Sequence, residues 1–210
     1  MPRQEVVLSS SSLRHPRLQV LANSVVLGGV LEANVSSNSH YAADRFRLRA
    51  ALSSVGPEVL SASDLRIEIC IGVDTGFRSL IVGLADHVDI DAVRGTVEIE
   101  GRDFSAGLIE TRIQQTFSNQ TASEIASGLA QGQGLAAQVA QTTTPVGRYY
   151  QSEHDQVALD QFCRATTQWD LLVFLAQHEG FDVWVSGSTL FFQPATAPVR
   201  GCVETTFCGR

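Results

Sequence analysis

Polar and apolar residues alternate in the first half of the chain, and this alternation constrains the fold more than any other feature. It is clearest in "RFRLRAAL" from Arg45, "DLRIEICIGV" from Asp64 and "GTVEIEGRD" from Gly95. A period of two puts apolar side chains on one face of a strand and polar ones on the other. Clusters of Gly, Ser, Asn and Asp separate these segments, as expected for turns. Residues 17–111 are therefore predicted to form an antiparallel β-barrel or sandwich of six or seven strands.

Helix signals replace the alternation after residue 111. Two threonines each precede an acidic residue by three positions, a spacing that allows a capping box at a helix start: Thr121 with Glu124, and Thr167 with Asp170. Another helix is predicted within "HDQVALDQFCRAT" (154–166), and Gly180 is predicted to end the helix that begins near Thr167. The stretch "FDVWVSGSTLFF" then predicts a hairpin that turns at Gly187 and Ser188.

These patterns predict an α+β chain in four parts. They are an N-terminal arm (1–16), a β-barrel domain (17–111), a helix-hairpin domain (112–194) and a C-terminal tail (195–210). Trp169 is expected in the core of the helix-hairpin domain. The tail carries Val203 and Phe207 but is too short to fold alone, so we expect it to lie on a neighbouring subunit or on a partner chain.

Charge and hydropathy exclude several classes of function. The net charge is −7, and no run of Lys or Arg is dense enough to suggest a nucleic-acid groove. The longest apolar runs, "SLIVGLA" and "DLLVFLA", are far below the roughly 20 residues that span a bilayer. The first residues lack the apolar core of a signal peptide. We therefore expect neither a membrane nor an extended nucleic acid as a binding partner.

Candidate catalytic residues are few and badly arranged. His154 and Asp155 are sequence neighbours, as are His178 and Glu179, and neighbours point in different directions on a strand or a helix. Cys163 lies in an apolar helical pattern without the flanking residues of a cysteine hydrolase. No catalytic residue is therefore assigned.

The sequence also predicts no metal ion and no cofactor. Cys70 and Cys163 are expected to be small buried residues, whereas Cys202 and Cys208 are compatible with a disulfide or with half of a metal site. Three glycines lack the following Lys-Ser/Thr of a phosphate loop and favour a helix that ends there: Gly128, Gly132 and Gly134. Three aspartates lack the spacing of a calcium loop and favour the solvent face of a strand and its turn: Asp86, Asp89 and Asp91.

A row of arginines is the remaining charged feature. Arg45, Arg47 and Arg49 share the polar face of one predicted strand. They are able to contact an anionic partner, but such rows more often pair with acids on the neighbouring strand. Glu98 and Glu100 are the expected partners.

The order of three segments resembles a known family. "LIVGLADHVDIDAVRGTVEIEGRDFSAGLIE" (80–110) is similar to the end of the first tube-like domain of phage baseplate hub proteins, with a Gly-x-x-Asp element at 83–86 and Gly-Arg-Asp at 101–103. "NQTASEIASGLAQGQGL" (119–135) resembles the helix that follows in those proteins. "TTQWDLLVFLAQHEGFDVWVSGSTLFFQP" (166–194) resembles their helix and hairpin at seven positions: Trp169, Leu172, Leu175, Ala176, Gly180, Leu190 and Phe192.

The family is the late control D family, which includes the hubs of Mu-like phages and the hub part of type VI secretion and other contractile-injection spikes. The resemblance spans roughly residues 17–194 and implies that 17–111 is a tube-like β-barrel. Family members continue into a second tube-like domain. We therefore expect either six copies of this chain, or three copies that alternate with barrels of another protein; the mixed ring is the favoured arrangement.

The resemblance implies a structural tail protein without catalysis, namely a baseplate hub subunit that joins the tail tube to the central spike or tip. The implied partners are the chain itself in a threefold or sixfold ring, the tube protein, the spike or tip protein and the tape-measure protein, with DNA only in transit through the lumen. The implied location is the virion tail, assembled in the host cytoplasm. Two alternatives stay open: a tail-associated cell-wall hydrolase and a free-standing bacterial binding module.

Overall fold

A computed structural model describes residues 17–37, 41–73, 76–113, 117, 119–146, 167–195 and 203–208. The chain divides into two compact units, which are described separately. Unit 1 comprises Met1–Ser39, Ala43–Asp103 and Arg200–Arg210, and unit 2 comprises His40–Ala42 and Phe104–Val199. The first boundary in the main body of the chain thus falls at Asp103, rather than at residue 111 as the sequence patterns suggested.

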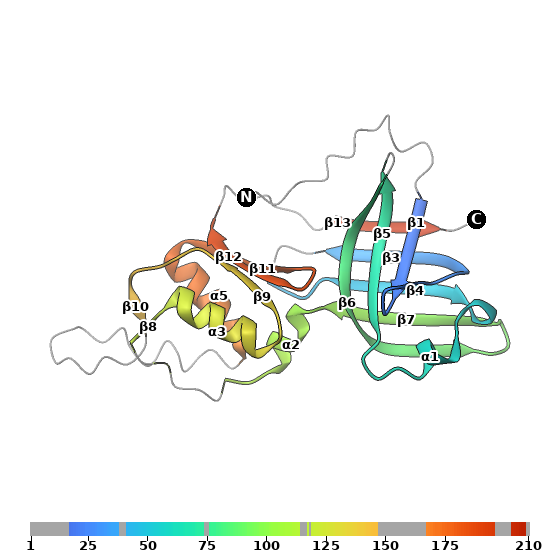
Figure 1. Ribbon diagram of the computed structural model, residues 1–210, viewed down its shortest axis with the longest axis horizontal. Coiled ribbons are helices and arrows are strands. Elements are labelled where there is room, and N and C mark those ends of the chain that lie inside the picture. The colour runs from blue at the N-terminus through green and yellow to red at the C-terminus, as the bar shows by residue number, and fades with distance from the viewer. Residues whose placement is uncertain are drawn as a thin grey trace. The chain divides into compact units, whose positions relative to one another are not determined.

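Unit 1 is built on one antiparallel sheet (Figure 1). Its eight strands are β1 (Arg17–Ala22), β2 (Val25–Val26), β3 (Val30–Ser37), β4 (Arg45–Ala51), β5 (Arg66–Val73), β6 (Gly76–Asp91), β7 (Thr96–Asp103) and β13 (Val203–Cys208). Between β4 and β5 lie a 3-10 turn, η1 (Leu52–Ser54), and one helical turn, α1 (Pro57–Leu60). Seven of the strands fall between residues 17 and 103, where the alternating patterns predicted six or seven.

The strand order is β13-β3-β4-β7-β6-β5-β1-β2, so β6 stands between its two neighbours in sequence. The first part of β6 pairs with β5 and the last part pairs with β7, and both ladders include Gly83 and Leu84. The sheet can therefore turn over its own apolar face, with β5 passing across β4 and β7 in Figure 1. Among the described residues the ladder ends at β13 and β2, so hydrogen bonding does not close it into a barrel.

The apolar face of this sheet forms the core of unit 1. On β4, Phe46, Leu48 and Ala50 are buried while the arginines between them are exposed, as the period of two predicted. Fully buried residues from other strands continue this core: Ile67, Ile69, Val97 and Ile99. The charged side chains of β4 and β7 consequently stand on the opposite, solvent-facing side, except for Asp103 at the end of β7, which is buried.

The end of the chain differs from its expected role as a separate tail. Residues 203–208 form β13, which pairs antiparallel with β3 of the same chain from Val203 opposite Ser37 to Cys208 opposite Glu32. An edge strand offers a row of free backbone donors and acceptors, which is a sufficient reason for a short extended segment to bind there. The expectation that this segment lies on a neighbouring subunit or on a partner chain is thus replaced by pairing within the chain.

Unit 2 combines short helices with small sheets. Its elements are α2 (Ser105–Glu110), β8 (Gln120–Thr121), α3 (Ala122–Gly132), β9 (Ala136–Val139), β10 (Pro145–Val146), α5 (Gln168–Glu179), β11 (Phe181–Ser186) and β12 (Thr189–Pro194). The hairpin of β11 and β12 turns at Gly187 and Ser188, as predicted, and β9 adds to it in parallel to give the order β11-β12-β9. The proposed helix in 154–166 and the arm at 1–16 lie outside the described residues.

The same local design occurs twice in unit 2, at an offset of 46 residues. Thr121 and Thr167 each cap a helix with a complete capping box, as predicted. Gly134 and Gly180 occupy the left-handed region after those helices, with φ of 69° and 67°. Each glycine leads into a strand, β9 in the first case and β11 in the second. The capping box supplies partners for backbone donors at the helix start, and glycine adopts a positive φ without a Cβ clash.

Trp169 lies in the core of unit 2, as predicted, with a relative exposure of 5%. Its indole N–H donates to the backbone carbonyl of Tyr41. The Tyr41 hydroxyl donates in turn to Asp182 at 3.4 Å, and burial, followed by the Asp182 carboxylate, raises the pKa of this phenol. Fully buried leucines and one phenylalanine surround this region: Leu171, Leu172, Leu175, Leu190 and Phe192.

Candidate functional site

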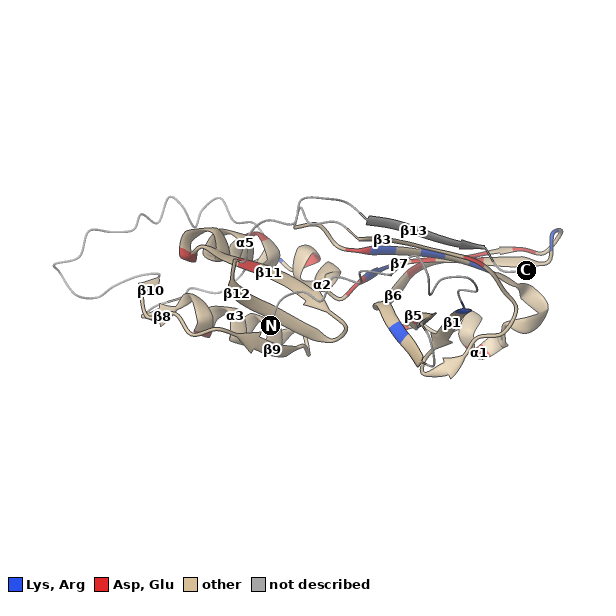
Figure 2. Cartoon of the chain, turned by 90° about the horizontal axis from the view of Figure 1, so that it is seen from above, with Lys and Arg blue, Asp and Glu red and all other residues tan. Residues whose placement is uncertain are grey.

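The solvent-facing side of the sheet in unit 1 carries a concentrated set of charges. We call it the charged face and define it by four arginines and five carboxylates: Glu32, Arg45, Arg47, Arg49, Asp86, Asp89, Glu98, Glu100 and Arg102. Figure 2 shows blue and red segments close together on the strands of this sheet, near the labels of β3 and β7. The pattern arises because every second residue of an antiparallel strand points to the same side.

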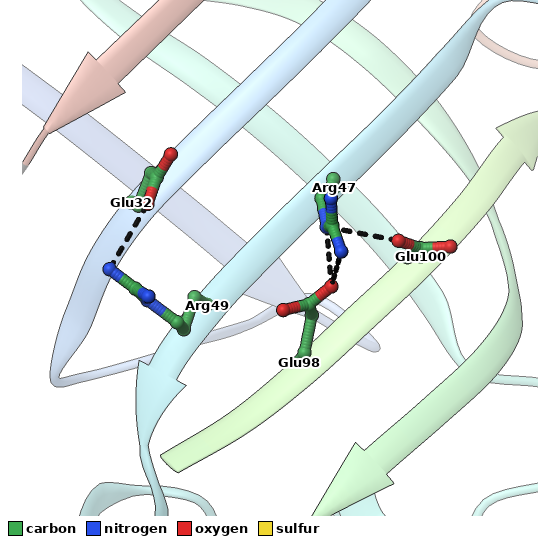
Figure 3. A network of polar contacts seen from close by, with 5 residues as sticks. All are labelled: Glu32, Arg47, Arg49, Glu98 and Glu100. Atoms are coloured by element: carbon green, nitrogen blue, oxygen red, sulfur yellow. Dashed lines mark hydrogen bonds and ion pairs between the residues drawn. The ribbon is translucent and has the colours of Figure 1, made fainter.

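Arg47 lies at the centre of the charged face. Its guanidinium contacts Glu98 through two nitrogens and Glu100 at 2.9 Å, and both acids stand on β7 (Figure 3). The hydrogen bond to Glu98, reinforced by the charge of that carboxylate, raises the pKa of Arg47. The predicted pairing of the arginine row with Glu98 and Glu100 is therefore confirmed for this residue.

Arg49 behaves differently. Register places it opposite Glu98 on one side and Glu32 on the other, and its guanidinium pairs with Glu32 at 3.1 Å (Figure 3). The expectation that Arg49 would join Glu98 and Glu100 is wrong, because β3 supplies a competing carboxylate. Arg45 stands opposite Ser36 and Arg102 and forms no ion pair within the described part of the chain.

The Gly-x-x-Asp and Gly-Arg-Asp elements meet at the edge of the charged face. Arg102 donates two hydrogen bonds to Asp86, at 2.7 and 2.8 Å, in the bidentate geometry that suits guanidinium and carboxylate. A register shift on β6 between Ala85 and His87 leaves Asp86 as the extra residue of a bulge. Such a bulge re-aims a side chain, and here it brings the Asp86 carboxylate to Arg102.

Two glycines of the same elements allow the strands to approach. A Cβ added at Gly83 meets the carbonyl oxygen of Arg102 at 2.0 Å, and one at Gly101 meets the carbonyl oxygen of Leu84 at 2.1 Å. Both obstacles are backbone atoms, which cannot rotate away as a side chain would. These glycines therefore fix the close contact of β6 and β7 at the point where the sheet turns.

The remaining aspartates of this region lie on a strand face and at the turn that follows it. Asp91 accepts hydrogen bonds from the backbone N–H groups of Val93 and Arg94 at 3.0 and 2.8 Å, and so holds the β6–β7 turn. Asp89 is exposed and stands opposite Glu98. Assignment of these residues to a strand face and its turn is confirmed, and the described residues contain no group of three or more potential metal ligands.

The candidate catalytic residues are not brought together where the structure describes them. His178 is in the last turn of α5, where its ring stacks on Phe174 at 6.3 Å between centroids, and Glu179 ends that helix. His154, Asp155, Cys163 and Cys202 lie outside the described residues. Cys70 is buried as predicted, and its burial, followed by the charge of Glu68, raises the pKa of its thiol to about 11.

The glycine-rich stretch of unit 2 follows its structural interpretation. Helix α3 runs to Gly132, and Gly134 then takes the positive φ that starts the link to β9. No helix in the described part of the chain combines the length and the apolar character that crossing a bilayer requires.

The chemical capacity of the charged face is electrostatic, because it presents guanidinium groups paired with carboxylates to solvent.

Comparison with known proteins places this fold. No family model and no curated protein sequence matches the chain. The 43 kDa tail protein of prophage MuSo2 from Shewanella oneidensis matches with a TM-score of 0.64 and 18% identity over 87% of this chain and 56% of that one. The tail protein of Neisseria meningitidis MC58 matches with a TM-score of 0.61 and 16% identity over 84% of this chain and 50% of that one.

A chain of the Francisella PdpA–VgrG complex also matches, with a TM-score of 0.55 and 10% identity over 88% of this chain and 32% of that one. The present chain spans about half the length of the two tail proteins. The structural neighbours are therefore two tail proteins, one of them from a prophage, and a VgrG-containing complex, and this chain shares their fold.

Proposed function

We propose that this chain is a structural subunit of a phage or phage-like tail, located in the baseplate hub between the tail tube and the central spike or tip. One observation carries the proposal: the match to two tail proteins extends over 84–87% of the chain and so includes both units in the same order. Fold alone does not determine function. The resemblance of the two glycine elements and of the α5 hairpin to baseplate hubs supports the hub in particular.

The proposed mechanism is assembly through shape and symmetry. The sheet of unit 1 acts as a tube-like barrel wall, and its end strands offer edges for pairing with neighbours. Val25 and Val26 of β2, at one end of the sheet, are 70% and 57% exposed, which favours a covered position in an assembly. The proposed assembly is a ring with threefold or sixfold symmetry.

The proposal includes partners and excludes catalysis. The partners are further copies of the chain, the tube protein, the spike or tip protein and the tape-measure protein, and DNA only passes through the lumen. The pairing of the charged face supports a structural role, because four of its five carboxylates form ion pairs with its arginines. Clearing of peptidoglycan by the purified protein in a zymogram would favour the tail-associated hydrolase instead.

Self-association is the first expected consequence. Because exposed strand edges and the exposed valines of β2 favour pairing, light scattering should show an oligomer, or a stable complex once the tube protein is added. Val25→Lys with Val26→Lys should weaken that association, and Val93→Lys, at the 98% exposed tip of the β6–β7 turn, is the matched exposed-valine control. A strict monomer that also fails to bind tube protein would contradict the hub assignment.

A further inference from the structure

The arginine row has the spacing of a phosphate-binding surface. Arg45, Arg47 and Arg49 stand on the exposed face of β4 at every second residue, which places them about 7 Å apart. Guanidinium groups bind phosphate strongly, and release of counterions makes rows of them bind nucleic acid without regard to sequence. Taken alone, β4 would therefore be expected to bind DNA.

The neighbouring strands oppose that binding. Arg47 is held between Glu98 and Glu100, Arg49 by Glu32, and the nearby Arg102 by Asp86. With Asp89, the charged face has five carboxylates for four arginines. A phosphate that approaches Arg47 must displace two carboxylates and remain close to both, so the attraction of the arginines is cancelled at short range.

These ion pairs have little effect on the fold itself. The side chains of Arg47 and Arg49 are 63% and 49% exposed, and pairs in such surroundings contribute little to stability. The apolar face of the same strands already supplies the core. The principal physical effect of the ion pairs is thus on the electrostatic potential at the solvent-facing side of the sheet.

We propose that the charged face lines the path of double-stranded DNA and that Glu98 and Glu100 keep its arginine row from binding the phosphates. The position on the DNA path rests on the proposed tail function. A wall of this kind presents a well-hydrated polar surface without apolar contacts to the DNA. It neither attracts the phosphates strongly nor repels them with a large net negative charge. Duplex DNA can then move past without being held.

The experiment converts the two glutamates to their neutral isosteres. Glu98→Gln with Glu100→Gln should give a protein that binds a fluorescent DNA duplex at low salt at least about tenfold more tightly than the original chain. The gain should fall between about 50 and about 200 mM salt with a log–log slope of about −2 to −3, the value for two or three phosphate contacts. Adding Arg47→Gln and Arg49→Gln should abolish the gain.

The control removes the same charge from another place. Glu58→Gln with Asp64→Asn changes two exposed acids outside the charged face, and this variant should bind DNA no better than the original chain. Circular dichroism verifies that each variant is folded. If the double variant Glu98→Gln with Glu100→Gln is unstable, the two single variants Glu98→Gln and Glu100→Gln are tested in its place. Equal gains in both double variants, no gain in either, or strong binding by the original chain would overturn the proposal. The hub assignment is judged separately, by assembly, and does not depend on these binding results.

Discussion

Replacing Trp169 with alanine should lower the free energy of unfolding by about 3–5 kcal/mol, the usual cost of removing a large aromatic side chain from a core. The indole is buried among the leucines of α5 and the residues of β12, and its N–H donates to the carbonyl of Tyr41. The substitution leaves a cavity and also removes the donor for that carbonyl. Urea unfolding followed by circular dichroism measures the loss without relying on tryptophan fluorescence.

The other tryptophan provides the control. Trp184 on β11 is half-buried and stacks on Phe191 with 5.1 Å between ring centroids. Trp184→Ala deletes the same atoms but loses mainly a surface pair, so the expected cost is about 1–2 kcal/mol. If Trp169→Ala proved no more harmful than Trp184→Ala, the core of unit 2 would have been assigned to the wrong residues.

Adding a single methyl group at Gly83 should lower the free energy of unfolding nearly as much as Trp169→Ala does. Gly83→Ala puts a Cβ 2.0 Å from the carbonyl oxygen of Arg102 and 2.7 Å from its carbonyl carbon, and both atoms belong to the β7 backbone. The strands must separate where the sheet turns, so the expected loss of stability is about 3 kcal/mol, at the upper end of ordinary overpacking.

Gly76→Ala is the matched substitution, because it adds the same methyl group to the same strand where nothing lies within 4 Å. Gly76→Ala should change the free energy of unfolding by no more than about 0.5 kcal/mol, as for most surface substitutions. A thermal denaturation series of the two variants compares them directly. Equal stability of both would show that β6 and β7 are not in close contact at Gly83.

Much of unit 1 was predictable from local pattern. Alternation along β4 identified its buried and exposed residues, because burial of one sheet face requires that period. The pairing of Arg49 with Glu32 was not predictable, because it depends on β3 and β7 being the two neighbours of β4, and strand order is a tertiary property. The bulge at Asp86 was missed for the same reason, since it appears only when β6 is matched to β7.

The sequence of unit 2 has strong local signals for most of its longer elements. The capping boxes at Thr121 and Thr167 and the hairpin turn at Gly187 were predicted from short-range chemistry. The repetition of the design has only a short signature in the sequence, "LAQ" at 129–131 and 175–177, each followed by glycine three residues later. The one-turn α1 and the six-residue α2 are too short to show helical periodicity, so no pattern in the sequence predicts them.

The central proposal is that this chain is a wall component of a tail hub. A cryo-electron microscopy reconstruction of the intact tail tests that claim most directly. It should show the chain in a ring between the tube and the spike or tip, with β3, β4 and β7 turned so that the charged face borders the lumen. Absence of the chain from the tail, or a ring in which that face is buried against another protein, would contradict the account.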